Sequence, residues 1–252
     1  MLTEDRHNFI RQVLATKGQI LAVDLVAQFG VSEDTARRDL RELTKAGQCQ
    51  RVYGGAVAIA PHSSPLAIRN MVMSEEKRRI AKCAITLIKP GQSLFIDGGS
   101  TNTTIAQAIP RNMPLTVTTN ALGVANALSA HTYIKLVLLG GVYDQALGTC
   151  VGTDAQRRIK QLNADLLLLG SCGIATKSGV SAFDEAEAEI KRAMAERAST
   201  IIVAATNDKL ETTAPFQIVP CRSITHLVVD QRASAGTLAK FRKLGIKIHI
   251  AH

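Results

Sequence analysis

Apolar residues recur at helical spacing in the first sixty residues and form short continuous runs after residue 90. At about 100° per residue, Ile10, Val13 and Leu14 fall on one side of a helix, which we expect over residues 6–16. A second short helix is expected over residues 23–29. The spacing therefore predicts that the chain begins with two short helices.

A third expected helix carries the most informative pattern. Ser32 is a good N-cap and Gly47 lies where a left-handed C-cap residue belongs, so the helix should run to Ala46. Three apolar residues fall on one narrow face: Ala36, Leu40 and Leu43. The opposite face is mainly basic: Asp34, Arg37, Arg38, Arg41 and Lys45. A short helix with one apolar stripe and a basic face suits the major groove of DNA.

A hairpin is expected directly after this helix. Residues 49–52 and 56–59 can pair around Tyr53, Gly54 and Gly55, because adjacent glycines are a strong hairpin-turn signal. Three helices and a hairpin make a winged helix-turn-helix. In such a domain Arg51, together with the turn, lies where a wing touches the phosphate backbone.

The basic helix has a second interpretation. The arginines could form a solvated helix face, held by pairs such as Asp34–Arg38. For an isolated basic helix we would favour that view. Because the turn, the cap, the basic face and the wing coincide here, the sequence favours binding to double-stranded DNA.

The rest of the chain alternates apolar runs with helical stretches. Strands are expected at residues 93–97, 115–119, 134–139, 166–170, 200–205, 225–230 and 247–250. Helices are expected at residues 103–108, 121–128, 154–161, 184–198 and 234–244. Short, nearly all-apolar strands separated by helices predict a Rossmann-like α/β fold with a mainly parallel sheet covered on both faces.

A stretch rich in Pro and Ser separates the two parts of the chain. Its helix-breaking and polar residues are Pro61, Ser63, Ser64 and Pro65. Ser74 should cap a helix that runs to about residue 88. We therefore expect a winged helix over residues 1–59, a linker over 60–73, and an α/β domain for effector binding and oligomerisation over 74–252.

Polar and small residues follow three of the expected strands. They are Asp97, Gly98, Gly99, Ser100 and Thr101 after the first, Thr118, Thr119 and Asn120 after the second, and Gly140 and Gly141 after the third. The first loop leads into a helix whose free N–H groups suit a phosphate. Asp97 would then bind a sugar hydroxyl, because two anions repel.

These strand ends could also be ordinary turns, with Ser100 or Thr101 only capping a helix. The D-G-G-S-T loop is neither a dinucleotide fingerprint nor a P-loop. Ligands bind at the carboxyl ends of parallel strands, however, and three such ends carry suitable groups. The convergence favours a ligand pocket.

Composition narrows the classes of protein further. The formal net charge is +9, yet residues 1–57 hold eight Lys and Arg against seven Asp and Glu. The argument for DNA therefore depends on where the arginines lie and not on bulk charge. The basic run over residues 75–82 is expected to be a solvated helix face, in preference to an auxiliary DNA-facing patch. No apolar run is long enough to span a membrane and the N-terminus is no secretory signal, which predicts a cytoplasmic protein.

The sequence offers little catalytic or metal-binding chemistry. The five cysteines show no C-x-x-C spacing and are expected to be reduced, mostly buried thiols. No histidine pair has metal-ligand spacing, and His226 lies in an expected strand as a satisfied core residue. Glu187 and Lys191 are one helical turn apart, which favours an ion pair slightly over direct ligand contact. We expect no catalytic residue, no metal site and no cofactor.

At this point the chain resembles the DeoR family of bacterial transcriptional regulators. The matching segments are Arg6-His7, V-S-E-D-T-A-R-R-D-L-R-E-L from Val31, and R-V-Y-G-G-A from Arg51. Leu21 and Ala36 depart from the usual family residues, at a helix cap and in the core. The resemblance supports a DNA-binding set: Ser32, Thr35, Arg37, Arg38, Arg41, Lys45, Arg51, Tyr53, Gly54 and Gly55.

The resemblance also implies a sensor domain with the fold of ribose-5-phosphate isomerase and glucosamine-6-phosphate deaminase, which usually binds a phosphorylated sugar. The implied effector residues are Asp97, Gly98, Gly99, Ser100, Thr101, Thr119, Asn120, Gly140, Gly141, Glu187, Lys191 and Lys209. Lys209 matches the lysine of the family's D-x-S-K segment, whereas Thr206 stands where the family has an acid.

The sequence therefore predicts a homo-oligomeric transcription factor, most simply a repressor of a carbohydrate operon, whose operator binding responds to a phosphorylated sugar. An active sugar-phosphate isomerase or deaminase would explain the second domain equally well, but it would leave the winged helix without a purpose. A purely architectural DNA-binding protein would leave the polar strand ends unexplained.

Overall fold

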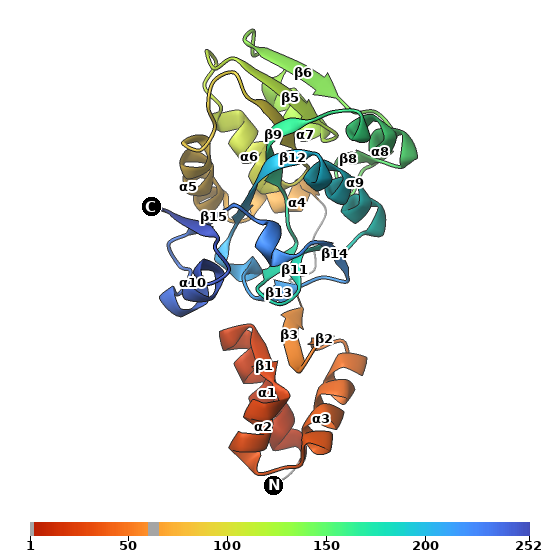
Figure 1. The fold of residues 1–252 in the computed structure, drawn as a ribbon, viewed down its shortest axis with the longest axis vertical. Helices are drawn as coiled ribbons and strands as arrows, with labels where there is room; N and C mark the ends of the chain where they lie inside the picture. Colours follow the sequence, from red (N-terminus) through yellow and green to blue (C-terminus); the bar gives the residue numbers. More distant parts are fainter. Residues whose placement is uncertain (1–2, 60–65) are drawn as a thin grey trace.

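The computed structural model describes residues 3–59 and 66–252, which form a small N-terminal unit and a larger α/β unit (Figure 1). The predicted linker residues Pro61, Ser63, Ser64 and Pro65 lie outside the described residues. We refer to residues 3–59 as the head and to residues 66–252 as the sensor unit.

The head is a winged helix-turn-helix, as predicted. Its elements are α1 (Thr3–Lys17), β1 (Gln19–Leu21), α2 (Ala22–Phe29), α3 (Glu33–Lys45), β2 (Gln50–Val52) and β3 (Gly55–Ile59). Ile10, Leu25 and Leu40 are among the buried residues that join the three helices. The rings of Phe9 and Phe29 meet edge to face at 5.0 Å, which closes α1 onto α2.

The structure adds the strand β1, which was not predicted because three residues are too few to show alternation. β1 pairs antiparallel with β3, and β2 pairs with the same strand. Gly55 is required at this crossing, since a Cβ there would lie 2.1 Å from the carbonyl oxygen of Ile20. β3 is therefore the central strand of the wing sheet.

The sensor unit is built on a seven-stranded sheet in the order β16-β15-β12-β9-β4-β5-β6, in which all neighbours are parallel. The strands are β4 (Ser93–Ile96), β5 (Leu115–Thr119), β6 (Ile134–Leu138), β9 (Ala164–Leu169), β12 (Ala198–Ala205), β15 (His226–Asp230) and β16 (Lys247–Ala251). These match the seven predicted strands to within two residues at each end. The Rossmann-like parallel sheet is confirmed.

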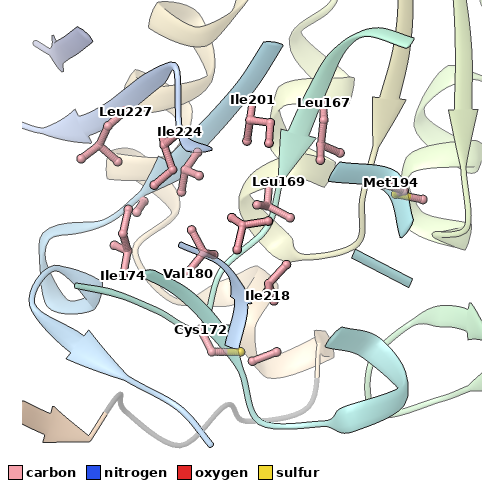
Figure 2. Packing of buried hydrophobic residues seen from close by; sticks show 14 of the residues in the cluster. Leu167, Leu169, Cys172, Ile174, Val180, Met194, Ile201, Ile218, Ile224 and Leu227 are labelled. Atoms are coloured by element: carbon pink, nitrogen blue, oxygen red, sulfur yellow. The ribbon is translucent and has the colours of Figure 1, made fainter. Parts of the chain in front are cut away.

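Helices cover both faces of this sheet: α5 (Ser74–Ile85), α6 (Ser100–Ala108), α7 (Leu122–Leu128), α8 (Thr153–Lys160), α9 (Glu185–Glu196) and α10 (Ala235–Arg242). Leu166 and Leu168 of β9 point into one hydrophobic cluster, and Leu167 and Leu169 point into the other. Figure 2 shows Leu167 and Leu169 packed among the apolar side chains of the second cluster. Successive side chains of β9 enter two cores, which explains why its sequence is apolar at nearly every position.

Two small antiparallel units were not predicted. One is the hairpin of β7 (Val142–Asp144) and β8 (Thr149–Val151). The other consists of β10 (Gly173–Ala175), β11 (Gly179–Ala182) and β14 (Phe216–Val219), in the order β10-β11-β14. Their strands are three or four residues long, and β10 and β11 are made mostly of small residues. Neither length nor periodicity marks them in the sequence.

The segment before α5 differs from the prediction. Residues 66–71 of the predicted linker form a helix, α4 (Leu66–Met71), whose first N–H donates to the carbonyl oxygen of Ala146. Ser74 is the first residue of α5 and not its cap. The cap position is held by Met73 in the left-handed region (φ 52°), because the chain turns sharply between the two helices. Lys77, expected in a solvated run, is buried.

The head and the sensor unit share a strand pairing. After the short 3-10 helix η1 (Asn207–Lys209), the chain forms β13 (Thr212–Thr213), which pairs parallel with the end of β3. Thr212 lies opposite Ala58, and Thr213 lies opposite Ile59. The wing sheet thus continues into the sensor unit, where β3 points toward β13 in Figure 1.

Candidate functional site

The third helix presents its basic residues to solvent. The Oγ of Ser32 accepts a hydrogen bond from the backbone N–H of Thr35 at 3.2 Å, which confirms the predicted N-cap. The predicted apolar stripe of Ala36, Leu40 and Leu43 is fully buried. The predicted basic residues of the opposite face are all exposed: Arg37, Arg38, Arg41 and Lys45.

Only part of this basic face is engaged in ion pairs. Arg37 donates to the Glu33 carboxylate at 2.6 Å. Among the described residues this is the ion pair of the face, and the suggested pair of Asp34 with Arg38 is not formed. An exposed pair of this kind contributes little, about 0–1 kcal/mol. Arg37 can therefore exchange Glu33 for a phosphate at small cost. Asp34, Thr35, Arg38 and Arg41 line a shallow hollow on the same face.

The turn between β2 and β3 lies beside α3. Tyr53 at its tip is 101% exposed, and the residues next to it are Arg51, Gly54 and Gly55. A groove between α3 and the wing is lined by residues of both, including Arg37, Arg51 and Tyr53. A fully exposed tyrosine at the edge of a basic groove is placed for contact with a partner.

One polar contact of α3 was missed by sequence reasoning. Asp39 is 2% exposed and receives two hydrogen bonds from Arg6, from Nε at 2.7 Å and from Nη2 at 3.0 Å. Nε2 of His7 lies 3.5 Å from the same carboxylate. This buried pair of Arg6 with Asp39, joined by two hydrogen bonds, fixes α3 against α1. These contacts give Arg6 and His7 a structural role away from the basic face.

A polar cavity lies at the carboxyl ends of β4, β9 and β12. The loop from β4 into α6 supplies Gly98, Gly99, Ser100, Thr101 and Asn102. The other lining residues are Arg69, Gly170, Ser171, Cys172, Glu187, Lys191, Ala204 and Lys209. The structure therefore brings the predicted D-G-G-S-T loop together with Glu187, Lys191 and Lys209, which are far apart in the sequence.

A buried charge cluster forms the floor of this cavity. Nζ of Lys191 lies 2.9 Å from Asp97 Oδ2, 2.9 Å from Glu187 Oε1 and 3.0 Å from the carbonyl oxygen of Gly170. Lys191 and Asp97 are 2% and 1% exposed in their side chains. The predicted pairing of Glu187 with Lys191 is present, and Asp97 shares the same ammonium group.

Burial and pairing act in opposite directions on these groups. Burial raises the pKa of Asp97, and the nearby Lys191 counteracts only part of that rise. Burial lowers the pKa of Lys191, but Asp97 and Glu187 outweigh it, so that its pKa lies above the ordinary value. Lys191 therefore stays charged and holds the two carboxylates in place.

Several buried polar atoms at the cavity have no hydrogen-bond partner within the described residues. They are Oδ1 of Asp97, Oγ1 of Thr101, Oδ1 of Asn102 and Oγ of Ser171. Each of these residues is at most 7% exposed. Folded proteins leave few buried polar groups unpaired, so a cluster of them beside a cavity indicates groups available to a ligand.

Glycines allow the close approach of these elements. A Cβ at Gly170 would lie 2.5 Å from the carbonyl oxygen of Gly98 and 2.9 Å from Asp97 Oδ2. Gly99 has φ +126° and open space around it, and its carbonyl oxygen accepts the N–H of Thr103 in the first turn of α6. Sequence reasoning missed Gly170, Ser171 and Cys172 because they follow the fourth predicted strand, whose end was not considered.

Five predicted effector residues are not among the lining residues. Asp97 lies beneath them in the charge cluster with Lys191, and the other four are Thr119, Asn120, Gly140 and Gly141. Thr119 accepts the N–H of Ala121 with its hydroxyl, and Asn120 donates to the carbonyl oxygen of Cys150 at 2.8 Å. Gly140 and Gly141 follow β6 and lead into the β7–β8 hairpin. Strand order explains why the residues after β5 and β6 lie outside the cavity. The cavity is built from β4, β9 and β12, and β5 and β6 lie on the opposite side of β4 from β9. These residues hold the hairpin beside the β4 loop.

Two other sequence predictions concern cysteine and histidine. All five cysteines are free thiols, and four of them are buried. His226 is half-buried and lies with Nδ1 2.9 Å from Nε2 of His249 on the neighbouring strand. His226 is therefore paired, as predicted, but it lies near the sheet edge and not in the core. None of the described helices is long and apolar enough to cross a membrane.

Comparison with known proteins identifies both units. Residues 6–62 match the model of the DeoR-like helix-turn-helix domain, and residues 72–231 match that of the DeoR C-terminal sensor domain. The chain is 32% identical, over 98% of its length and 93% of the other protein, to an Escherichia coli O157:H7 protein named for repression of the aga operon. It is 34% identical to the glycerol-3-phosphate regulon repressor of Escherichia coli K12, over 83% of each chain.

Among solved structures, ribose 5-phosphate isomerase A from Methanocaldococcus jannaschii superposes on 54% of this chain and 54% of its own, with a TM-score of 0.40 and 14% identity. The two regulators, by contrast, align over most of both chains.

Proposed function

The chain belongs to the DeoR family of DNA-binding transcriptional regulators, and from this premise we propose that it represses a carbohydrate operon and is released by a phosphorylated sugar. The observation that carries the proposal is a pair of sites in one chain. An exposed basic helix with a wing lies in the head, and a cavity with unpaired buried polar groups lies in the sensor unit.

The head would bind operator DNA with α3 in the major groove. Thr35, Arg37 and Arg38 would contact base edges or phosphates, while Arg51 and Tyr53 would hold the wing on the backbone. Ser32, Gly54 and Gly55 shape these elements, and Arg41 and Lys45 extend the basic face. One winged helix contacts too little DNA for tight specific binding, so the protein would act as a homo-oligomer of at least two chains.

The cavity would hold the phosphate of the effector at the N-terminus of α6. The first-turn N–H groups, the hydroxyl of Thr101 and the positive charge of Lys209 support this orientation. The sugar hydroxyls would then reach Oδ1 of Asp97 and the carboxylate of Glu187, which Lys191 holds in place. An indirect role remains for Thr119, Asn120, Gly140 and Gly141, which would hold the β7–β8 hairpin beside the loop after β4.

An isomerase or deaminase activity is less well supported. It would need a carboxylate free to act as a general base. Asp97 and Glu187, the carboxylates nominated from the sequence, are both bound to Lys191 at 2.9 Å. The relatives compared above are both named as repressors. We therefore place the chain among regulators and not among enzymes, acting in the cytoplasm where its operator lies.

We propose that the head and the sensor unit are two domains and that the head ends near residue 59, as the sequence predicted, whereas the sequence put the start of the sensor unit at residue 74. Because α4 contacts the sensor unit through Ala146 and Lys77, the sensor unit would begin at residue 66, earlier than the sequence suggested.

The test measures effector-dependent release from DNA. An operator selected from genomic fragments is titrated with the protein, alone and with ribose 5-phosphate, glucosamine 6-phosphate or glycerol 3-phosphate. Gly99→Asp places a carboxylate where the phosphate should lie, so this variant should hold the operator and ignore the effector. Gly91→Asp is the control, since Gly91 also has positive φ (+85°) and open space but lies outside the cavity. Equal responses from Gly99→Asp and wild type would place the effector elsewhere.

A further inference from the structure

Arg69 reaches the effector cavity from the segment that connects the head to the sensor unit. It lies on α4, the first described element after residue 59, and it lines the same cavity as Ser100, Thr101 and Lys209. Its Nε is buried without a hydrogen-bond partner among the described residues. A guanidinium group in a polar cavity with a free inward donor is suited to an oxyanion.

The backbone of Arg69 is held by a buried lysine, Lys77. Nζ of Lys77 donates to the carbonyl oxygens of Arg69 and Val72, at 2.6 Å for Val72. Lys77 is 6% exposed. A helix of six residues cannot pair its own last carbonyl oxygens, and Lys77 supplies the donor for those at the end of α4. This contact ties the backbone of Arg69 at the end of α4 to α5.

Three cations, Arg69, Lys77 and Lys209, lie near one another at this end of the cavity, with the acids Asp208 and Glu76 nearby. Burial lowers the pKa of Lys77 to about 8, and the charges of Lys209 and Arg69 contribute to the shift. Burial also lowers the pKa of Lys209, to which Arg69 and Lys191 contribute, and Nζ of Lys209 donates to the carbonyl oxygen of Ser171 at 2.7 Å. Mutual repulsion of desolvated cations is relieved by a bound anion.

We propose that Arg69 binds the anionic group of the effector together with Lys209, and so links the occupied cavity to the segment that leads to the head. This inference rests on the proposed function and adds to it a cation that the D-G-G-S-T loop does not contain. An arginine recognises a phosphate through two parallel N–H···O bonds, which a lysine cannot form.

The experiment compares Arg69→Gln, Arg69→Lys and Arg78→Gln. Arg78 is the matched control because it is exposed on the adjacent helix α5 and pairs only with Glu75 among the described residues. Calorimetry measures the binding of inorganic phosphate and ribose 5-phosphate, and urea unfolding checks that the variants are equally stable. Arg69→Gln should weaken binding of both probes about ten- to hundredfold, the range for loss of a hydrogen bond to a charged group. Arg69→Lys should restore part of the loss, and Arg78→Gln should bind as wild type does.

Each outcome separates this inference from the proposed function. If wild type binds the probes and Arg69→Gln binds them equally well, the role of Arg69 is refuted while the effector site stands. If wild type binds neither probe and shows no release from DNA with the sugar phosphates above, both fail together. A loss in Arg78→Gln equal to that in Arg69→Gln would show a general charge effect and refute a specific contact.

The pairing of β3 with β13 carries a second, independent inference. Gly18, at the end of α1, has φ +73°, and a Cβ there would lie 2.3 Å from Cβ of Glu211 and 2.7 Å from its carbonyl oxygen. Glu211 is itself buried and adopts φ 57°, which a side chain rarely does. Only Leu210 and Glu211 separate Lys209 at the cavity from Thr212 in the wing sheet, and Glu211 is the strained residue of the two.

We infer that this seam, defined by β3, β13 and the contact of Gly18 with Glu211, transmits occupancy of the cavity to the orientation of the head. This second inference also rests on the proposed function. A shift of Lys209 toward a ligand must move β13, and β13 moves the central strand of the wing through the pairing.

Gly18→Ala tests the seam by inserting a methyl group at the contact. Gly47→Ala is the control, since Gly47 has a similar φ (+68°) and open space around it. Operator affinity is measured with and without the most effective of the three sugar phosphates named above, and hydrogen exchange reports the opening of residues 55–59. Gly18→Ala should expose those amides and reduce the effector-dependent change in operator affinity at least threefold, with the affinity for the effector itself unchanged. Gly47→Ala should retain the full change. The inference is refuted if Gly18→Ala exposes the amides of residues 55–59 and the effector still releases the protein fully from DNA. It is also refuted if those amides stay as protected in Gly18→Ala as in wild type.

Discussion

Lys191→Met should destabilise the protein strongly at neutral pH. The substitution keeps the apolar stem of the side chain but removes the ammonium group that lies 2.9 Å from both Asp97 and Glu187. Removing one partner of a buried ion pair typically costs about 3–5 kcal/mol, because the remaining charge is left uncompensated. For a chain of this size such a loss corresponds to a fall in Tm of about 6–20 °C. Lys82→Met, on the exposed side of α5, should change stability by less than about 0.5 kcal/mol.

The pH dependence of this loss identifies its cause. The folded-state pKa of Asp97 is already raised by burial, and Lys191 is the nearby charge that counteracts the rise. In Lys191→Met the pKa should rise further, so the folded state binds a proton more readily than the unfolded state. The contribution of Asp97 is then most favourable below its unfolded pKa of about 3.9 and decreases as pH rises through the folded pKa. The deficit relative to wild type should be small near pH 4–5 and largest at pH 7 and above.

Urea unfolding at several pH values measures this deficit. The double variant Asp97→Asn/Lys191→Met should recover part of the stability, because the uncompensated carboxylate is gone. A deficit below about 1 kcal/mol at pH 7, or one that does not vary with pH, would show that the charge cluster does not hold the site together.

The remaining predictions concern the head and the assembly. Arg38→Ala should weaken operator binding by about 1–3 kcal/mol if the side chain makes a bidentate base contact, and a gel-shift titration with wild-type affinity would remove Arg38 from the interface. Gly55→Ala should unfold or distort the wing, since its Cβ would lie 2.1 Å from the carbonyl oxygen of Ile20, and an unchanged melting profile would argue against that packing. A fragment of residues 66–252 should associate at micromolar concentration, and light scattering of a monomer would contradict assembly through the sensor unit.

Much of the fold could be predicted because its signals are local. The apolar stripe of α3, the Ser32 cap and the paired glycines of the wing each act within a few residues, where sterics and hydrogen bonding decide the conformation. The seven core strands were found for a related reason. A strand covered on both faces is apolar at nearly every position, and that pattern is visible without knowledge of its neighbours.

The candidate site was predicted only in part. The loop at Gly99 and Ser100 follows a strand and starts a helix, which is a local feature, and it does line the cavity. Gly140 and Gly141 follow a strand just as plainly but lie beyond β5, away from β9. Strand order decides which strand ends share a cavity, and strand order depends on contacts between residues far apart in the chain.

The sequence by itself determined the winged helix, the parallel α/β class and the loop that suits a phosphate. Only the tertiary structure decided that Arg69 and Lys209 enter one cavity, that Lys77 is buried behind them, and that β13 pairs with β3. These features involve short segments whose own preferences are weak. They form because the two apolar cores of the sheet hold distant segments together, so that the energy that fixes them comes from packing and not from local pattern.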